Sequence, residues 1–338
     1  MNLGELWALL EQQPAPGGQG MMMRSAHAGM HCAVLAALCF PGAERTLVIR
    51  LPETEARMLT STGLTPAIEL TLHDESATHP GQASVLLRTH DPRHRDLFSH
   101  IGDDLVEQLR REPAQPVPAL LQRIELWREF LHRREETFTE PRLRGLFGEV
   151  WFLAEHLLPR TVPHNHMAAI AAWTGPLGAR RDFNLGEASL DMKTGTPGTS
   201  SVQISSIQQL SPASGTRLYL GHLILQRDLA GHTLPELVDR TRLMLDSEAR
   251  ELLDSRLLRA GFIDADRDQA PLNDLRLIAH QFDTYAIAQG FPALTSETLP
   301  PAIVACSYTL DLSTCGAYRV DPGGIPGIGE SHRSPHEQ

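Results

Sequence analysis

Residues 181–195 read RDFNLGEASLDMKTG, in which a turn signal around Gly186 separates two short runs of strand-forming residues. This pattern predicts a hairpin of two antiparallel strands. Because side chains alternate along a strand, Asp191 and Lys193 are expected on one face of the second strand. Asp182 lies near the start of the first strand, at about the same height as this pair. The hairpin is therefore expected to bring two carboxylates and one amine together.

The chain has 30 basic residues, and Lys193 is the single lysine among them. Arginine keeps its charge under all relevant conditions, whereas lysine offers a compact ammonium whose pKa a site can tune. A lysine in a chain that otherwise avoids lysine therefore indicates chemistry. The spacing Asp-x-Lys carries little weight alone, because 41 of the 338 residues are acidic. The alternative is a surface hairpin with an ordinary ion pair between Asp191 and Lys193.

The side chains of the hairpin are of the kind that phosphodiester hydrolysis requires. Mg²⁺ prefers hard oxygen ligands and is typically held by one or two carboxylates, waters and substrate phosphate. Asp182 and Asp191 can supply these carboxylates. The metal lowers the pKa of a bound water and offsets charge on the phosphate, while Lys193 orients that water or stabilises the transition state. The sequence therefore predicts a Mg²⁺ site on the hairpin.

Two side chains outside the hairpin are candidates for the same site. The pattern of residues 140–158 predicts a helix with an apolar stripe, and Glu149 borders that stripe, where it can serve as a metal ligand or general base. The pattern of residues 201–207 predicts a strand on which Gln203 can hydrogen-bond to the attacking water or the DNA backbone. An ordinary polar strand face is the alternative for Gln203.

The charge of the chain narrows the classes of nucleic-acid protein to which it can belong. Its formal net charge is −11, whereas proteins that coat nucleic acid non-specifically are usually basic. An endonuclease remains compatible, since a local stripe of arginines can guide a DNA backbone while acidic residues hold metal. The predicted helices 92–111 and 119–134 alternate Arg and Glu, which indicates a solvated helix face or, alternatively, arginines that contact phosphates.

The cysteines and the apolar runs indicate a protein of the reducing cytoplasm. The four cysteines fall in two distant pairs without C-x-x-C spacing, so neither a zinc ribbon nor a disulfide framework is predicted. No apolar run approaches the roughly 20 residues of a membrane span. The apolar residues 30–40 are signal-like, but their late position and short length favour a core strand or helix. We therefore expect no membrane contact.

Three regions are predicted along the chain. Residues 1–92 form a mainly β N-terminal region, residues 93–320 a nuclease-like domain with a helical lead-in, and residues 321–338 a flexible tail rich in Gly, Pro and Ser. From residue 140 onward the expected order is one helix, four strands and two helices. On the first of these helices, Gly145 and Gly148 are placed for close packing. The predicted fold class is α/β (α+β), with a mixed sheet flanked by helices.

Five segments of the chain resemble, in order and spacing, a bacterial family of PD-(D/E)XK motif proteins. They are 145–153 (GLFGEVWFL), 173–176 (WTGP), 181–183 (RDF), 190–194 (LDMKT) and 202–210 (VQISSIQQL). The resemblance implies a restriction-endonuclease-like fold and a setting among bacterial restriction or phage-defence genes. The site that it implies consists of Glu149, Asp182, Asp191 and Lys193. Arg181 replaces the proline of the motif, and Asp191 stands where Glu is more frequent.

We expect a Mg²⁺-dependent DNA endonuclease of the PD-(D/E)XK type, with Mn²⁺ able to replace Mg²⁺. The alternative is a non-catalytic DNA-binding or scaffold subunit of a defence complex. The sequence lacks a phosphate loop, a G-x-S-x-G elbow and a G-x-G-x-x-G motif, which disfavours an NTPase, a triad hydrolase and a dinucleotide fold. Expected partners are DNA, proteins of a defence complex and a second copy of the chain, because cutting both strands usually requires two active sites.

Overall fold

The computed structural model describes residues 2–15, 17–27, 32–59, 62–65, 68–75, 78–134, 139–211, 215–295, 299–300, 302–303 and 305–326. The chain divides into two compact units, Met1–Glu136 and Thr137–Gln338. This division differs from the expected boundary after residue 92. The two long helices that follow residue 92 pack within the first unit, where the backbone N–H of Leu3 donates to Asp103 at 2.8 Å.

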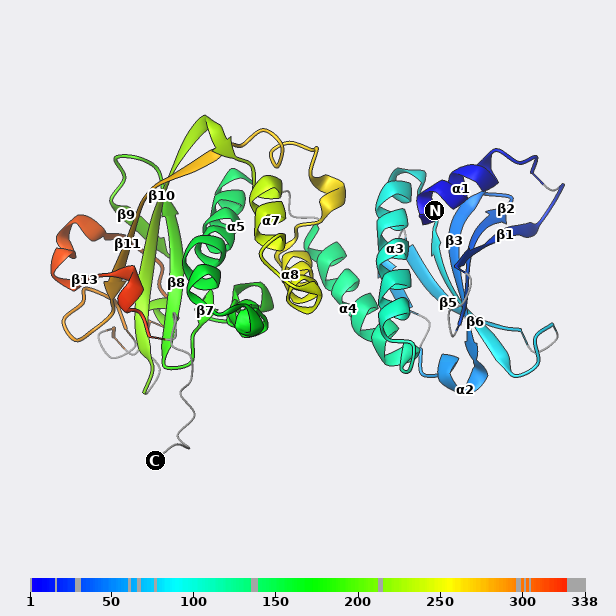
Figure 1. The fold of residues 1–338 in the computed structure, drawn as a ribbon, viewed down its shortest axis with the longest axis horizontal. Coiled ribbons are helices and arrows are strands. Elements are labelled where there is room, and N and C mark those ends of the chain that lie inside the picture. Colours follow the sequence, from blue (N-terminus) through cyan, green and yellow to red (C-terminus); the bar gives the residue numbers. More distant parts are fainter. Residues whose placement is uncertain are drawn as a thin grey trace. The chain divides into compact units, whose positions relative to one another are not determined.

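The first unit is a six-stranded antiparallel sheet with helices against it (Figure 1). Its elements are α1 (Leu3–Glu11), β1 (Gly20–His27), β2 (Ala33–Phe40), β3 (Glu44–Pro52), α2 (Glu53–Ala56), β4 (Thr62–Thr65), β5 (Ile68–Asp74), β6 (Gln82–Thr89), α3 (Arg95–Arg111) and α4 (Pro116–Arg134). The strand order is β1-β2-β3-β6-β5-β4. Helices α1 and α3 pack together through Trp7 and Phe98, whose ring centroids are 5.2 Å apart. The mainly β character predicted for this region is confirmed.

Arginines on α3 and α4 are engaged by carboxylates of the same two helices. Arg110 and Arg111 lie 2.7 Å and 2.9 Å from the same oxygen of Glu107. Arg123 lies 2.5 Å from Asp104. These ion pairs favour the solvated helix face over arginines that are held ready for phosphates.

The second unit contains a mixed five-stranded sheet of order β13-β11-β10-β8-β7. Its helices and strands are α5 (Glu140–Phe152), a π-helical turn (Leu153–Leu157), α6 (His166–Ala171), β7 (Phe183–Asn184), β8 (Ala188–Gly195), β9 (Ser201–Ile204), β10 (Arg217–His232), α7 (Leu234–Arg242), α8 (Ser247–Ala260), β11 (Leu277–Ala286), β12 (Tyr308–Asp311) and β13 (Arg319–Val320). Strands β8 and β10 are parallel, whereas β7 and β11 run antiparallel to their neighbours. The predicted mixed sheet flanked by helices is confirmed.

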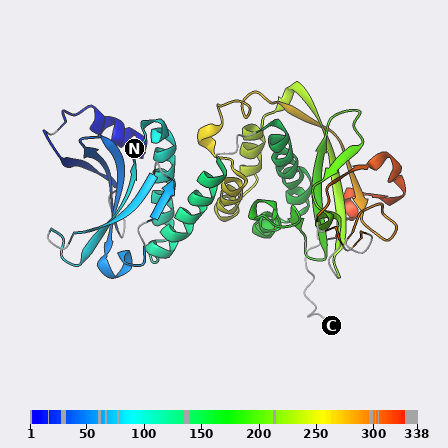
Figure 2. The same ribbon diagram turned by 180° about the vertical axis from the view of Figure 1, so that it is seen from behind.

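Strand β9 departs from the arrangement expected for the region after the hairpin. The sequence predicts a strand over 201–207, but β9 ends at Ile204 and pairs with β12 rather than joining the five-stranded sheet. Its buried residues, Val202 and Ile204, pack with Leu220 and Leu310. This second apolar cluster lies on the sheet face opposite the cluster beneath α5, α7 and α8. Figure 1 shows these helices on one side of the sheet and β9 on the other, and Figure 2 shows the same arrangement from behind.

The two faces of β8 have different surroundings. Leu190 and Met192 belong to the apolar cluster beneath α5, which also holds Leu223 of β10. Because side chains alternate along a strand, Asp191 and Lys193 point to the opposite face. The strand therefore separates an apolar packing face from the face that carries its charged residues.

The structure bears on two further expectations, the flexible C-terminal tail and the absence of a membrane span. Of the expected flexible tail, residues 327–338 lie outside the described residues, whereas Ile325 is buried in the apolar cluster of the second unit. Among the helices that the structure describes, none has both the length and the apolar character that a membrane crossing needs.

Helix α5 lies close to β8 at Gly148. A Cβ atom at Gly148 would lie 2.5 Å from the Cγ2 of Thr194, whereas a Cβ at Gly145 would meet nothing within 4 Å. Close packing is thus confirmed for Gly148, and the same expectation is wrong for Gly145. Since α5 carries Glu149, the glycine beside it sets how near that carboxylate comes to the sheet.

We expect Gly148→Ala to destabilise the protein by about 1–3 kcal/mol, because the added methyl overpacks the contact with Thr194. Gly145→Ala on the same helix is the matched control and should stabilise by up to about 1 kcal/mol through helix propensity. Urea unfolding followed by circular dichroism measures both. Thr194→Ser removes the Cγ2 methyl and should restore part of the loss; equal stability of the two alanine variants would contradict the packing argument.

Candidate active site

The hairpin of β7 and β8 aligns Asp182 with Asp191. Phe183 pairs with Leu190 in antiparallel register, so the position before Phe183 lies opposite Asp191. The Asp182 carboxylate accepts a 2.6 Å hydrogen bond from the backbone N–H of Met192. The side chain therefore takes the place of a backbone acceptor where the short strand β7 begins.

The segment before the hairpin is tied to Asp182 through its backbone. The N–H groups of Thr174 and Gly175 both donate to the Asp182 carbonyl, at 2.7 Å and 2.9 Å. A Cβ at Gly175 would lie 2.9 Å from Oε2 of Glu149 and 3.1 Å from Oδ1 of Asp182. The two carboxylates therefore lie close together beside Gly175. Oε2 of Glu149 and Oδ1 of Asp182 are no farther apart than the sum of 2.9 Å and 3.1 Å. Any larger residue at this position would fill the space between them.

Glu149 is held by Trp173. The indole N–H of Trp173 donates to Oε2 of Glu149 at 2.7 Å, and the Trp173 side chain is fully buried in the apolar cluster beneath α5. Trp173 therefore positions a carboxylate supplied by another element. Nothing in the sequence spacing indicates this contact, because it joins residues 24 positions apart across a loop and a helix.

Asp191 and Lys193 form an ion pair that is largely withdrawn from solvent. The Lys193 Nζ lies 2.7 Å from Oδ2 of Asp191, and the two side chains are 18% and 2% exposed. An ordinary ion pair on an exposed hairpin is thus not what the structure contains. The ammonium contacts the buried Oδ2 as an ion pair, and no other donor among the described residues reaches that oxygen. Oδ2 of Asp191 therefore depends on this one contact.

Burial raises the pKa values of all three carboxyls, and repulsion from a neighbouring carboxylate adds to it for Glu149 and Asp182. Burial, followed by the charge of Asp182, raises the pKa of Glu149 well above its ordinary value. Burial and the charge of Asp191 raise the pKa of Asp182 to about 7. Burial also raises the pKa of Asp191, against the opposing effect of Lys193. Carboxylates crowded in this way favour protons or a cation among them.

The carboxylates suit a divalent ion in their chemistry. Among the residues that the structure describes, no group of three or more His, Cys, Asp or Glu side chains is already arranged to hold a metal. The donors of the cluster are nevertheless hard carboxylate oxygens, which Mg²⁺ prefers, and Oδ2 of Asp191 is a buried oxygen whose one contact among the described residues is the Lys193 ammonium. Burial raises the pKa of each carboxyl, so the charged forms gain from a cation beside them. The residues therefore fit a divalent cation.

The structure places Gln203 outside this cluster. Gln203 is exposed on β9 and lies in register with Thr309 of β12, whose hydroxyl donates to Oε1 of Gln203 at 2.9 Å. No contact within the described part of the chain joins Gln203 to the carboxylates. Its hydrogen bond to Thr309 instead engages the side chain within the small sheet of β9 and β12. Its assignment to the site stays a prediction without support from this geometry.

Comparison with known families gives one result. A family model described as "Putative PD-(D/E)XK family member, (DUF4420)" matches residues 3–313. The match covers most of both compact units. No curated protein and no solved structure gives a significant match.

We expect Asp182→Asn to stabilise the metal-free protein more at pH 8 than at pH 5. The folded protein holds the Asp182 proton up to about pH 7, whereas the ordinary value is 3.8. The wild type is therefore fully stabilised by this group below pH 4 and loses about 2–4 kcal/mol as the pH rises from 4 to 7. Asparagine is neutral throughout and keeps an acceptor for Met192.

Urea unfolding in EDTA at the two pH values measures this difference. Asp274→Asn, at an exposed carboxylate of the same unit, is the matched control and should show no pH-dependent gain. An Asp182→Asn gain of the same size at pH 5 and pH 8 would show that the carboxylate is not crowded as described.

Proposed function

The chain belongs to the PD-(D/E)XK family whose model it matches, and from this premise we propose that it is a metal-dependent nuclease that hydrolyses phosphodiester bonds of DNA. One observation carries the proposal. Three buried or half-buried carboxylates and the only lysine of the chain converge on one hairpin; they are Glu149, Asp182, Asp191 and Lys193. Metal-assisted hydrolysis of a phosphodiester requires acidic ligands and a nearby positive donor in such an arrangement.

Asp182, Asp191 and Glu149 would hold Mg²⁺, or Mn²⁺ in its place. A bound ion of this kind lowers the pKa of a water ligand and offsets negative charge on the phosphate. Lys193 supplies a second positive charge and a hydrogen-bond donor, two positions along the strand from Asp191, for the attacking water or a phosphate oxygen. Trp173 keeps Glu149 directed toward the hairpin through its N–H.

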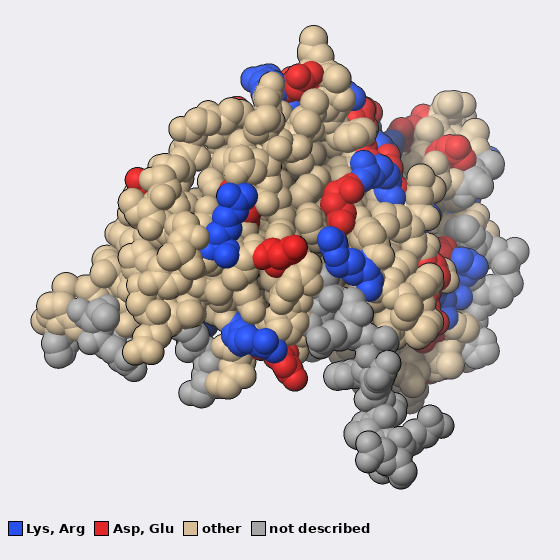
Figure 3. Space-filling model, turned by 60° about the vertical axis from the view of Figure 1, so that its left-hand side comes forward, with Lys and Arg blue, Asp and Glu red and all other residues tan. Residues whose placement is uncertain are grey.

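Three features of the setting are part of the proposal. DNA is the substrate, the system is bacterial restriction or phage defence in the cytoplasm, and the active form is a homodimer, since cutting both strands usually requires two sites. On the face that Figure 3 brings forward, basic and acidic side chains are interspersed, and the described residues form no continuous basic stripe. Weak general attraction to DNA is consistent with the net charge of −11 and with cutting that depends on a specific target.

We expect Lys193→Ala to reduce DNA cleavage at least about 100-fold, because a preorganised positive donor at the reacting phosphate is lost. The assay is cutting of supercoiled plasmid and phage DNA, methylated and unmethylated, in Mg²⁺ or EDTA. Arg217→Ala is the control, since Arg217 is an exposed cation on β10 that pairs only with the exposed Glu187 in the contacts described. Cutting by Lys193→Ala at the wild-type rate would sink the assignment.

The same assay separates a nuclease from a scaffold. Cutting by the wild type that stops in EDTA supports the nuclease. Wild-type protein that binds DNA without cutting it under any of these conditions would instead make the chain a binding subunit of a larger complex.

We expect Mg²⁺ to raise the melting temperature of the wild type and to leave Asp191→Asn unchanged, because ligands that bind only the folded state stabilise it. The rise should be larger at pH 8 than at pH 5, since the carboxyls must lose their protons to bind metal. Thermal denaturation with Mg²⁺ or EDTA measures the effect without any substrate. Asp274→Asn should behave as wild type, and an equal shift in Asp191→Asn would place the metal elsewhere.

A further inference from the structure

A cavity of about 510 Å³ lies in the second unit, on the sheet face to which Asp191 and Lys193 point. Lys193 of β8 pairs with His222 of β10, and His222 pairs with Asp283 of β11. Paired residues of adjacent strands share a face, so these three side chains form a row across the sheet. His222 and Asp283 line the cavity, which therefore begins one strand away from the lysine of the proposed active site.

The wall of this cavity is continuous with the active-site strand. Strand β8 ends at Gly195, and residues 197–200 of the loop that follows line the cavity. Neighbouring strands lie about 4.8 Å apart, so Asp283 is about 10 Å from the position of Lys193 across the sheet. Successive nucleotides of one DNA strand rise about 3.4 Å. The cavity is thus within a few nucleotide steps of the phosphate that the proposed nuclease cuts.

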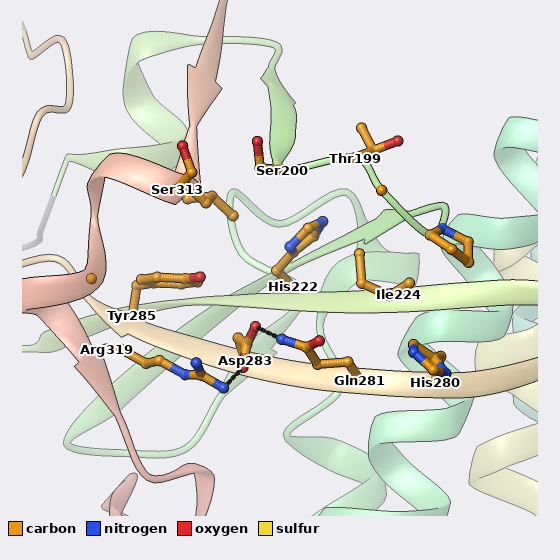
Figure 4. Close-up of a pocket in the computed structure, with 14 residues that line it drawn as sticks. Thr199, Ser200, His222, Ile224, His280, Gln281, Asp283, Tyr285, Ser313 and Arg319 are labelled. Carbon is orange, nitrogen blue, oxygen red and sulfur yellow. Dashed lines mark hydrogen bonds and ion pairs between the residues drawn. The ribbon is translucent and has the colours of Figure 1, made fainter.

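One buried ring in the cavity has an unused hydrogen-bonding atom. His222 is 3% exposed, and its Nε2 has no hydrogen-bond partner among the described residues. In Figure 4 the ring extends from β10 toward the side on which Thr199 and Ser200 lie. A Cβ at Gly195 would lie 2.7 Å from this Nε2, so the glycine leaves room for the ring. The ring nitrogen is thus a buried polar atom, packed beside Gly195, for which the described residues supply no hydrogen-bond partner.

The remaining polar groups of the cavity are balanced in charge. Asp283, which is 6% exposed, accepts a hydrogen bond from the amide of Gln281 at 2.5 Å and another from the guanidinium of Arg319. Burial lowers the pKa of His222, which keeps its ring neutral near pH 7. With the one carboxylate paired to the one guanidinium, neither a phosphate nor a metal ion finds an unbalanced opposite charge there.

The polar and aromatic side chains that line the cavity suit a planar, uncharged heterocycle. Gln281, Asp283 and Tyr285 alternate along β11 and share the face of His222, so they present an amide, a carboxylate and an aromatic ring to one space. Cavities of about 300–1,000 Å³ with a few convergent polar groups are typical small-molecule sites. Enzymes that extrude a nucleobase read it through hydrogen bonds to its edge together with contacts to its flat faces.

We propose that this cavity receives a nucleobase extruded from the DNA strand beside the scissile phosphate. The inference rests on the proposed nuclease function and adds a means by which the target is recognised. His222 and Gln281 read the edge of the base, and Tyr285 contacts its flat face. The loop 197–200 connects this reading to the strand that carries Asp191 and Lys193.

The test uses 2-aminopurine, whose fluorescence rises when it leaves the base stack. After the wild-type cut is mapped, synthetic duplexes carry 2-aminopurine at successive positions around it. Each duplex is bound to full-length Lys193→Ala, and fluorescence anisotropy confirms binding. We expect a several-fold rise at one position near the cut. Adding His222→Leu or Gln281→Leu should abolish the rise while binding remains.

Gln226→Leu, on the same strand and face as His222 but outside the cavity, is the matched control and should keep the full rise. Since His222 is buried, Gln281→Leu tests the cavity at an exposed side chain should the first variant not fold. Absence of any rise in bound duplexes that the wild type cuts would overturn the extrusion and leave the nuclease intact. A rise that both cavity variants retain would place the base elsewhere. Absence of cutting by the wild type would end both proposals.

Discussion

The hydrogen bond from the Met192 N–H to the Asp182 carboxylate is the interaction on which the geometry of the site depends. Strand β7 has only two residues, so its backbone pairing with β8 ends just where Asp182 begins. The carboxylate then satisfies a β8 donor that would otherwise lack a partner at the strand edge. This bond fixes Asp182 opposite Asp191, and the Asp182 carbonyl in turn fixes the segment that carries Gly175.

The same arrangement makes the site costly for the metal-free fold. Glu149, Asp182 and Asp191 are withdrawn from water, which raises the pKa of each, and a neighbouring carboxylate raises those of Glu149 and Asp182 further. A protein selected for stability alone would separate or replace such groups. Their convergence instead fits the proposed metal site, in which a cation would supply positive charge beyond that of Lys193.

The sequence predicts those parts of the site that depend on local alternation. Asp191 and Lys193 lie two positions apart, so their shared face follows from strand geometry alone, and a turn at Gly186 brings Asp182 alongside. Pairings between residues far apart in the sequence cannot be predicted from this alternation. Gln203 has the correct period for a site strand, yet β9 pairs with β12, more than 100 residues away, because its apolar side chains complete a second core cluster. The contact between Trp173 and Glu149 cannot be predicted from the sequence either, because it also joins separate elements of the chain.

The parallel pairing of β8 with β10 joins the proposed chemistry to the proposed recognition. Antiparallel neighbours in a hairpin can be read from a turn, whereas a parallel partner is chosen by packing on both faces of the sheet. Here the apolar faces of β8 and β10 lie against α5, and that alignment leaves Lys193 beside His222 on the other face. A shift of one residue would turn His222 into the apolar core and an apolar side chain toward the lysine. The packing that stabilises the sheet thus also determines which groups of the proposed recognition cavity stand next to the proposed cutting site.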